Sequence, residues 1–499
     1  MLNRFGHYIV ACCVAWLAVA PAFAQEDFST WLEAFKQEAQ VRGISPATLD
    51  AAFAGAQPVP RALELDRIQP EFIQPFSIYL QRRVTPGRIA RGQELLVAHQ
   101  ALFDAVEARY GVPKGVLAAF WGLETNYGTQ LGGFAIPATL STLAYDGRRS
   151  AFFRAELFDA LCILEAGHIA AADMKGSWAG AMGQMQFMPS TFRRYAVDGD
   201  ADGRIDPWTS LPDALYSAAN YLRQAGWRAG EPVAIEVRLP DNFDWGRARL
   251  HHRLPVADWA AAGVSPVAPR PLSPGAADGT PQPTASPPQP NPLMEPLAIR
   301  LGRQETPAKS LVIPQGDSDF LRSEAREKSY VPQAGEGASV MPKPINDTLP
   351  AVSGPAAIVL PQGWRGPAFM VFDNFDVVMQ WNKSVNYVLS VAHLADRLRG
   401  GTELAGGQEA EREALSLAQM MRLQQSLDEL GFAPGTVDGL SGMRTQTAIR
   451  RYQRVHALPV DGHPSPTLLA HVQQAHAEAV AAGSLTPSRI LPTFAGPEN

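Results

Sequence analysis

The chain has 499 residues, of which 46% are hydrophobic and 18% are charged. At about 100–200 residues per domain, it is long enough for several domains, each with its own core. A formal net charge of −6 leaves no excess of positive charge for nucleic acid, and three cysteines are too few for a disulfide scaffold or a cysteine-based metal site.

The N-terminus has the pattern of a secretory signal peptide. A short basic segment precedes an apolar run at 8–19, and residues 22–24 (AFA) form a small-x-small cleavage site. The apolar run is too short to span a membrane. We therefore expect residues 1–24 to be removed on export to the periplasm, with no transmembrane span. The lipoprotein-like sequence before Cys12 is faint, so we do not expect a lipid anchor.

Most of the segment 27–239 has the apolar periodicity of helices, and residues 233–239 (VAIEVRL) alternate as in a short strand. The composition then changes. In the stretch 265–350, 17 of 86 residues are proline, which disfavours both helix and sheet. Order is expected again in 351–400. The entropic cost of closing a loop grows only slowly with its length. We therefore expect one domain, formed by 25–264 and 351–400, that is interrupted by a disordered insert at 265–350.

The C-terminal part contains a second, smaller unit. A polar linker, 401–414, leads to a compact segment at 415–475, which is followed by a tail, 476–499. Three helices are expected in this segment. The first has a leucine face, the second covers about 444–456, and the third follows the N-cap residue Ser465.

Two loops of this unit repeat the tripeptide Val-Asp-Gly, at 437–439 and 460–462. Asp-Gly is favoured in tight turns, so a turn is the simplest interpretation. The unit has too few residues for a catalytic site of its own. We therefore interpret it as a binding module.

The segment 115–128, GVLAAFWGLETNYG, contains a candidate acid. On a helix, Glu124 shares one face with Leu117, Phe120 and Trp121, where a core residue is expected. Burial favours the neutral carboxyl group and raises its pKa, which suits a general acid near neutral pH. The alternative is a glutamate at a helix end that pairs with an arginine.

Two further segments carry candidate chemistry. Residues 175–189 (KGSWAGAMGQMQFMP) combine small residues, which allow close approach of a ligand, with glutamines that can donate to it; tight packing is the alternative. The loop with Asp198, Asp200 and Asp202 resembles the first half of a calcium loop, but position twelve is Thr209. A solvated acidic turn is the alternative there.

Five motifs follow one another in the first domain: GLETNYG at 122–128, Arg-Arg at 148–149, KGS at 175–177, GAMGQMQFMPS at 180–190 and FDNF at 372–375. Together they resemble the lytic murein transglycosylase B family, glycoside hydrolase family 103. The C-terminal unit is similar to the peptidoglycan-binding type 1 domain through LQQSLDELGF, VDG and AIRRYQ. The resemblance implies a mainly α fold, with a lysozyme-like transglycosylase domain and a small three-helix peptidoglycan-binding domain.

The resemblance also implies a function. Such an enzyme cleaves the MurNAc-β-1,4-GlcNAc bond of peptidoglycan without water and leaves 1,6-anhydro-MurNAc ends. Glu124 matches the family's single general acid/base, no cofactor is required, and the partners are peptidoglycan glycan strands rather than nucleic acid. We expect a monomer. A hydrolytic muramidase and a non-catalytic scaffold that binds the wall are the alternatives.

The family's substrate-contacting positions have counterparts in this sequence. Ser177 and Gln186 match residues that orient the acid and the N-acetyl group, and Arg148 and Arg149 match residues that contact the muramyl and peptide part. The remaining matches to cleft-lining positions are Phe187, Tyr79, Tyr221, Asn382 and Tyr387. At Trp381 a better-known member has tyrosine, so we assign no role to this position.

The acidic loop has a family counterpart that binds calcium. The implied metal ligands are Asp198, Asp200, Asp202, Asp213 and the backbone carbonyl of Arg204. The spacing to Asp213 is slightly longer than in the family. We therefore expect this loop to be able to hold a structural calcium ion.

Overall fold

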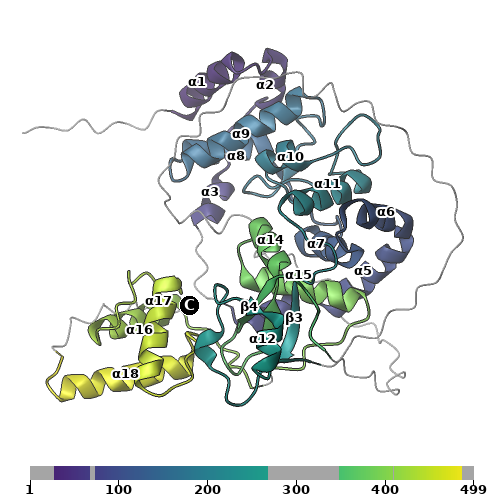
Figure 1. The fold of residues 1–499 in the computed structure, drawn as a ribbon. Coiled ribbons are helices and arrows are strands. Elements are labelled where there is room, and N and C mark those ends of the chain that lie inside the picture. Colours follow the sequence, from purple (N-terminus) through teal and green to yellow (C-terminus); the bar gives the residue numbers. More distant parts are fainter. Residues whose placement is uncertain (1–26, 68–73, 268–347, 408, 486–499) are drawn as a thin grey trace, which may run out of the picture.

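The computed structural model describes residues 27–67, 74–267, 348–407 and 409–485 (Figure 1). The predicted signal peptide, 1–24, and most of the predicted insert lie outside these residues. The described chain forms a helical body, a small sheet beside it and a C-terminal helical module next to the sheet. The predicted mainly α fold is confirmed. No helix of the described residues is long and apolar enough to cross a membrane.

The helical body consists of two groups of helices that meet between α10 and α11. In the first group, α1 to α3 pack with α8 to α10. In the second, α5, α6, α11 and α15 pack against α7, and α4 and α14 pack against α15. The bounds are α1 (Phe28–Val41), α2 (Pro46–Ala52), α3 (Pro60–Arg67), α4 (Phe76–Arg83), α5 (Pro86–Ala98), α6 (Gln100–Tyr110), α7 (Lys114–Thr125), α8 (Ile136–Tyr145), α9 (Ser150–Glu165), α10 (Pro189–Tyr195), α11 (Leu211–Gln224), α14 (Asp373–Trp381) and α15 (Val385–Leu398).

The ends of these helices follow from their sequences. Asp27, Ser45, Thr85 and Ser210 each accept a backbone N–H of the first turn, at the starts of α1, α2, α5 and α11. Such caps satisfy N–H groups that have no partner inside the helix and contribute about 1 kcal/mol each. Proline occupies the first turn of α2, α5 and α11, where no N–H is needed.

The sheet contains five antiparallel strands in the order β4-β6-β7-β3-β5. A separate two-stranded pair, β1 with β2, lies in the helical body. The bounds are β1 (Phe134–Ala135), β2 (Lys175–Gly176), β3 (Ala234–Arg238), β4 (Leu254–Pro255), β5 (Ser265–Pro266), β6 (Pro355–Val359) and β7 (Ala368–Val371), with α12 (Val256–Ala261) after β4 and a 3-10 helix at Trp245–Arg247.

The strand predicted at 233–239 is confirmed as β3, but the other strands of the sheet were not predicted from the sequence. β6 and β7 are buried along nearly their whole length, so they are continuous apolar runs without the alternation that marks a half-exposed strand. β5 pairs with β3 through Ser265 and Pro266. The ordered domain therefore extends past the boundary predicted at residue 264.

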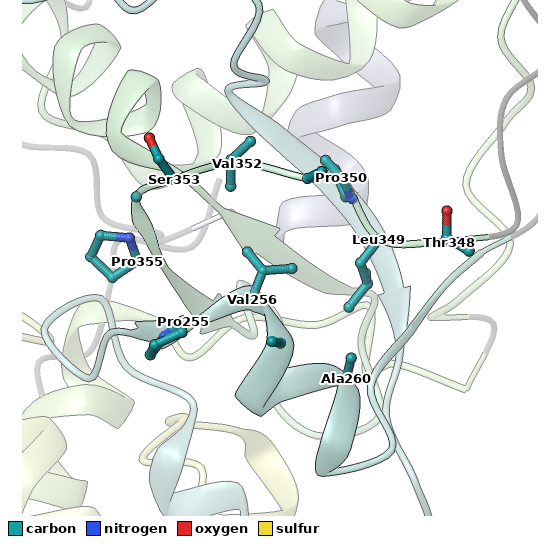
Figure 2. A pocket seen from close by; sticks show the side chains of 12 residues that line it. Pro255, Val256, Ala260, Thr348, Leu349, Pro350, Val352, Ser353 and Pro355 are labelled. Atoms are coloured by element: carbon teal, nitrogen blue, oxygen red, sulfur yellow. The ribbon is translucent and has the colours of Figure 1, made fainter.

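The chain re-enters the sheet from the insert beside an apolar pocket of about 500 Å³ (Figure 2). The pocket lies between α12 and residues 348–355. Its lining contains proline, alanine, valine, leucine, glycine, serine and threonine, with no titratable side chain. It therefore has no group for acid–base chemistry.

The C-terminal module has the three predicted helices, α16 (Leu417–Glu429), α17 (Met443–Val455) and α18 (Pro466–Ala481), around a core of its own. α18 continues past the predicted end of the module at residue 475. The reason is that helix-forming residues continue without a breaker as far as Gly483, which adopts a left-handed φ of 69°.

The two Val-Asp-Gly turns of the module are held in the same way. Gln424 on α16 accepts the backbone N–H of Gly439 at 2.8 Å and donates to the side chain of Asp438 at 3.1 Å. Gln453 on α17 accepts the N–H of Gly462 at 2.9 Å and donates to Asp461 at 2.6 Å. The repeat is thus a structural device in which a helical glutamine secures an Asp-Gly turn.

The module is docked on the sheet by hydrogen bonds. The buried side chain of Gln362 accepts the N–H of Ser77 on α4 at 2.8 Å and donates to the carbonyl of Glu411 in the linker at 2.6 Å. The N–H of Trp364 donates to the carboxylate of Asp461 at 3.0 Å. The loop after β6 therefore joins the helical body, the linker and the module.

Candidate active site

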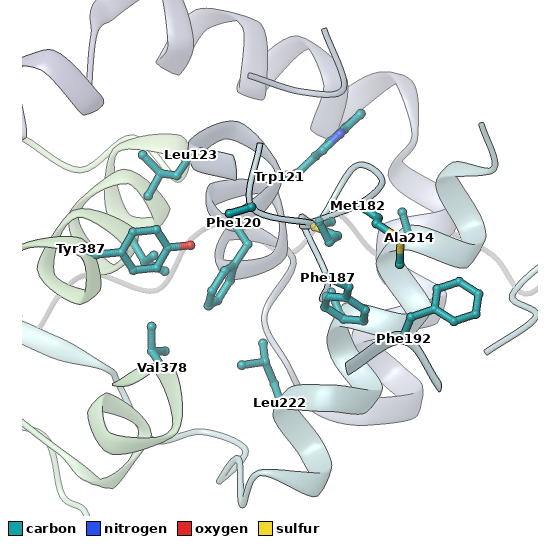
Figure 3. Packing of buried hydrophobic residues seen from close by; sticks show 14 of the residues in the cluster. Phe120, Trp121, Leu123, Met182, Phe187, Phe192, Ala214, Leu222, Val378 and Tyr387 are labelled. Atoms are coloured by element: carbon teal, nitrogen blue, oxygen red, sulfur yellow. The ribbon is translucent and has the colours of Figure 1, made fainter. Parts of the chain in front are cut away.

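Helix α7 lies at the centre of the second helical group, and Glu124 lies in its last turn. From Gly115 to Thr125, all residues of the helix are buried except Glu124, which is partly exposed. Phe120 and Trp121 lie in the core, as the predicted helical face requires (Figure 3). A carboxyl group is thus held at the end of an otherwise apolar helix.

The turn after α7 is fixed by Tyr127. This residue has a φ of 59°, which is uncommon for a bulky side chain, and its hydroxyl donates to the carbonyl of Arg88 at 2.8 Å. A Cβ at Gly92 would lie 2.2 Å from the Tyr127 hydroxyl oxygen, and a Cβ at Gly122 would lie 2.8 Å from its ring. Only glycine fits at these two positions without displacing the tyrosine.

The segment 175–189 forms a folded loop against the end of α7. The hydroxyl of Thr125 donates to the carbonyl of Gln184 at 2.8 Å, which fastens the loop to the helix. The hydroxyl of Ser177 accepts the N–H of Ala181 at 2.9 Å, so this predicted substrate residue braces the loop from inside.

Glu124 accepts two side-chain hydrogen bonds from the part of the chain that follows the insert. Tyr387 on α15 donates its hydroxyl to Oε1, and Trp381 at the end of α14 donates Nε1–H to the same oxygen at 3.0 Å. Because both donors use Oε1, Oε2 remains available to a substrate.

Trp381 is held in place by aromatic rings. Its ring centroid lies 4.5 Å from that of Phe120, 5.2 Å from Phe187 and 5.0 Å from Tyr221. Figure 3 shows Phe120 between Tyr387 and Phe187. The rings orient the indole N–H and limit the exposure of the carboxylate to water. They also bring two predicted residues, Phe187 and Tyr221, into the surroundings of Glu124.

Burial dominates the electrostatics of this site. It raises the pKa of Glu124 from its ordinary value of 4.5 to about 7. The hydrogen bonds from Tyr387 and Trp381 and the positive charge of Arg83 each lower the pKa, but they do not overcome burial. A carboxyl group with this pKa can both give and accept a proton near neutral pH.

Helix α4 contributes two groups to the surroundings of Glu124. The guanidinium of Arg83 lies 5.4 Å from the ring of Tyr79. The pKa of Tyr387 is raised well above its usual range, chiefly by burial, then by Glu124 and to a smaller extent by Tyr79. Tyr79, which the family resemblance predicted, therefore belongs to the same site.

The two predicted arginines form ion pairs with another group. Arg148 donates from Nε to the carboxylate of Asp66 at 2.7 Å, and Arg149 also donates to Asp66. The Asp66 side chain is buried on α3. The arginines are therefore held by an internal carboxylate, and their described hydrogen bonds do not involve Glu124.

Gln186 and Asn382 are buried and make local hydrogen bonds. The amide of Gln186 donates to the carbonyl of Gly183 at 3.0 Å, and its backbone φ is 49°. The side chain of Asn382 accepts the N–H of Ser384 at 3.2 Å, just before α15. These contacts shape the loop that carries Phe187 and the segment that leads into α15, the helix of Tyr387.

The acidic loop has free acceptor capacity. Carboxylate oxygens of Asp198, Asp200 and Asp202 lie within 4.8 Å of one another, and Oδ1 of Asp198 is buried without a hydrogen-bond partner. Asp213, on α11, accepts the N–H groups of Gly199 and Asp206, each at 2.6 Å. Through these two hydrogen bonds, Asp213 holds the backbone of the acidic loop against the start of α11.

The sequence analysis did not assign a role to three residues that contribute to the site or its surroundings. Trp381 was left unassigned, although an indole also supplies an N–H donor. Arg83 and Asp66 lie in segments without a motif, so only the fold shows that they act on Glu124 and on the arginine pair.

The sequence matches the family described as the transglycosylase SLT domain over residues 27–290 and 303–396, which is more than half of the chain. The chain belongs to this family. Residues 416–472 match the putative peptidoglycan binding domain family. Both predicted resemblances are confirmed.

Solved and curated relatives agree with this family. SltB3 from Pseudomonas aeruginosa, solved in complex with NAG-anhNAM-pentapeptide, is 38% identical with a TM-score of 0.71, and the match covers 90% of this chain and all of that one. The membrane-bound lytic murein transglycosylase B of Escherichia coli (strain K12) is 32% identical over 197 residues, which are 38% of this chain. The chain thus spans about half, 52%, of the length of that relative.

A more distant structure, the soluble lytic transglycosylase SltB1 from Pseudomonas aeruginosa, is 23% identical with a TM-score of 0.52. The match covers 74% of this chain and 99% of that one. It supports the fold of the SLT domain alone.

The indole of Trp381 provides a test of the electrostatics. Trp381→Phe keeps an aromatic ring but removes the donor to Oε1 of Glu124. Because the charged form of Glu124 then loses stabilisation, the pKa of this carboxyl group should rise from about 7 to a higher value. The midpoint in the pH profile of kcat/KM should move up by about one unit, since a hydrogen bond to a charged group contributes about 1.5–3 kcal/mol.

Trp227→Phe is the matched control, because Trp227 also donates its indole N–H, to the carbonyl of Gly111 at 2.9 Å, and has no hydrogen bond to Glu124. Its pH profile should stay unchanged. A midpoint that stays in place or falls in Trp381→Phe would contradict the role assigned to the indole.

Proposed function

We propose that this protein is a periplasmic lytic transglycosylase that cleaves the MurNAc-β-1,4-GlcNAc bond of peptidoglycan. The observation that carries the proposal is the state of Glu124, which has a pKa of about 7, two donors on Oε1 and a second oxygen available to substrate. The SLT-domain and peptidoglycan-binding families support the substrate class. The predicted signal peptide supports the periplasm as the site of action.

Two proton transfers by one residue complete the proposed reaction. Protonated Glu124 donates its proton to the glycosidic oxygen, and the bond from that oxygen to C1 of MurNAc breaks, so GlcNAc leaves as an alcohol. The carboxylate then takes the proton of the C6 hydroxyl as O6 bonds to C1. The product is a 1,6-anhydro ring, Glu124 is protonated again, and no water is consumed.

The surroundings of Glu124 favour this route over hydrolysis. Ordinary glycosidases use two carboxyl groups about 5–9.5 Å apart, one of which is a nucleophile or activates water. Among the described residues, Arg83 is the charged group that shifts the pKa of Glu124, which it lowers. No carboxylate is among the causes of the shift. A single carboxyl group that alternates between acid and base suits the anhydro product.

Mass spectrometry of products from purified peptidoglycan tests the proposal. A lytic transglycosylase releases 1,6-anhydro-muropeptides, whereas a hydrolytic muramidase releases reducing ends that are heavier by one water. A scaffold releases neither. Reducing ends, or no soluble product, would therefore contradict the proposed reaction.

Glu124→Gln should remove the chemistry while leaving the shape of the site intact. Glutamine has no proton to donate to the leaving oxygen and cannot accept one from the C6 hydroxyl. General acid–base assistance is typically worth about 10²–10⁴-fold, and both roles are lost here, so kcat should fall to the upper end of this range or beyond it.

Glu236→Gln is the matched control for this change. Glu236 on β3 also has a raised pKa because of burial, but it accepts the N–H groups of Ala405 and Gly406. Its activity should remain within about twofold of the wild type, as for a substitution outside the chemistry. Anhydro product from Glu124→Gln at more than about a tenth of the wild-type rate would show that another residue is the acid.

We also propose that the acidic loop holds a structural calcium ion. Calcium prefers six to eight oxygen ligands, and the three clustered carboxylates with the carbonyl of Arg204 supply that chemistry. The unpartnered, buried Oδ1 of Asp198 supports the fit. Asp213 would keep the loop in shape through its two backbone N–H bonds.

Calcium should raise the thermal stability of the protein. At a concentration about 100 times its Kd, the ion should add about 2.7 kcal/mol to the free energy of unfolding. Asp200→Ala should abolish this increase, whereas Asp159→Ala, which removes the partly buried carboxylate partner of Arg193, should leave it unchanged. No rise in Tm at millimolar calcium would mean that the loop is only a turn.

A further inference from the structure

Docking of the module brings arginines of two domains together. Arg249 follows the 3-10 helix at Trp245–Arg247, and Arg454 lies in the last turn of α17. Their Nη2 atoms lie 3.6 and 3.8 Å from the point where a Cβ at Gly246 would stand. Glycine at this position leaves room for both guanidinium groups to converge.

A third positive charge lies one helical turn earlier. Arg450 on α17 packs flat against the backbone of Gly462, where a Cβ would stand 2.6 Å from its Cζ. Its Nε is buried and has no hydrogen-bond partner. The pKa of Arg450 is lowered from its ordinary value, first by burial and then by Arg249, while the charge of Asp461 acts in the opposite direction. Arg450 and Arg454 also repel each other, because they lie one turn apart on α17. We call Arg249, Arg450 and Arg454 the junction arginines.

Two carboxylates lie near these arginines. Oδ1 of Asp244 accepts the N–H of Gly246 at 2.9 Å and would lie 3.0 Å from the same Cβ point. Asp461 accepts the N–H of Trp364 at 3.0 Å and the side-chain amide of Gln453 at 2.6 Å. Within the described parts of the chain, no junction arginine forms a salt bridge. Because the three arginines outnumber the two carboxylates, these five groups together carry a net positive charge.

An aromatic surface adjoins these charges. Trp364 is 38% exposed, and its ring centroid lies 5.9 Å from that of Trp245. The guanidinium of Arg365 lies 4.6 Å from the Trp364 ring. Trp364 therefore combines a partly exposed apolar ring with an adjacent guanidinium group, which can bind a carboxylate.

We propose that this junction is a second binding site, which holds the stem-peptide carboxylates of a peptidoglycan strand on the junction arginines and the adjoining sugars on Trp364. The choice of ligand rests on the proposed function. The guanidinium groups suit paired contacts with carboxylates, and the tryptophan suits the apolar face of a sugar ring. Neither half of the site is complete without the other, because Arg249 and Trp364 belong to the sheet and Arg450 and Arg454 to the module.

Binding to insoluble peptidoglycan tests this site. Full-length protein with Glu124→Gln, which should not cleave the strand, is incubated with purified sacculi, and the bound fraction is measured against sacculus concentration. Adding Arg249→Gln together with Arg454→Gln should weaken binding about tenfold, equal to about 1.4 kcal/mol. The difference should shrink at high salt, because salt screens the charges. Trp364→Ala should weaken binding in the same direction.

Arg451→Gln is the matched control, since it removes one charge from an exposed position of the same helix. It should bind as the parent does. Sacculi whose stem-peptide carboxylates have been converted to neutral amides, with a carbodiimide and an amine, stay insoluble. They should bind the parent more weakly and should no longer distinguish it from the double variant. Equal binding by parent and double variant on intact sacculi, equal loss in Arg451→Gln, or a difference that persists on the amidated sacculi would each overturn the proposal.

Catalysis separates this site from the reaction itself. With Glu124 restored, the double variant should cleave a short soluble glycan without peptides at the wild-type kcat/KM, and a matching thermal unfolding curve should show that it folds. Loss of cleavage in this variant would mean that the junction belongs to the catalytic site, which contradicts the proposal. Absence of anhydro products from the wild type would instead refute the proposed function and leave the binding comparison to decide the junction.

Discussion

The burial of one carboxyl group among aromatic rings is the constraint on which the rest of this structure depends. Glu124 ends an apolar helix among aromatic rings, so its charged form loses solvation and its pKa rises to about 7. Two hydrogen bonds and one positive charge act against burial. With stronger donors, Glu124 would stay a carboxylate; without any donor, it would stay a neutral acid. The balance between burial and these interactions therefore decides whether one residue can perform both proton transfers.

The fold brings this balance together from distant parts of the chain. Glu124 precedes the proline-rich insert, whereas both of its donors, Trp381 and Tyr387, follow it. On the far side of the insert, β6 pairs with β4 and β7 pairs with β3, and both of these partners precede the insert. The sheet therefore fixes the returning chain before it reaches α14 and α15. The insert therefore interrupts the sequence of the domain without separating the two halves of its site.

The glutamine side chains show how small polar contacts organise the rest of the molecule. Gln362 connects α4, which carries Tyr79 and Arg83, with the linker through two hydrogen bonds. Gln424 and Gln453 each secure an Asp-Gly turn of the module, and the second of these turns meets the sheet at Trp364. Because buried amides are costly without partners, these contacts favour one docked arrangement of the module.

The sequence predicted those features that depend on local pattern. The face of α7 that carries Glu124 and the three helices of the module follow from helical spacing, and specific motifs indicated the family. The sequence did not predict β6 and β7, because strands buried on both faces show no alternation. Nor did it reveal the bond between Trp381 and Glu124 or the pairing of Arg148 with Asp66, since these contacts arise between segments that only the tertiary fold brings together.

Direct titration of the Glu124 carboxyl group tests the central claim most directly. In protein labelled with ¹³C in glutamate side chains, the signal of Glu124 can be identified by its absence from Glu124→Gln and followed from acid to alkaline pH. We expect a midpoint at about 7. A midpoint near the ordinary value of 4.5 would show that the carboxylate is solvated, and it would contradict the proposal that this residue acts as both acid and base.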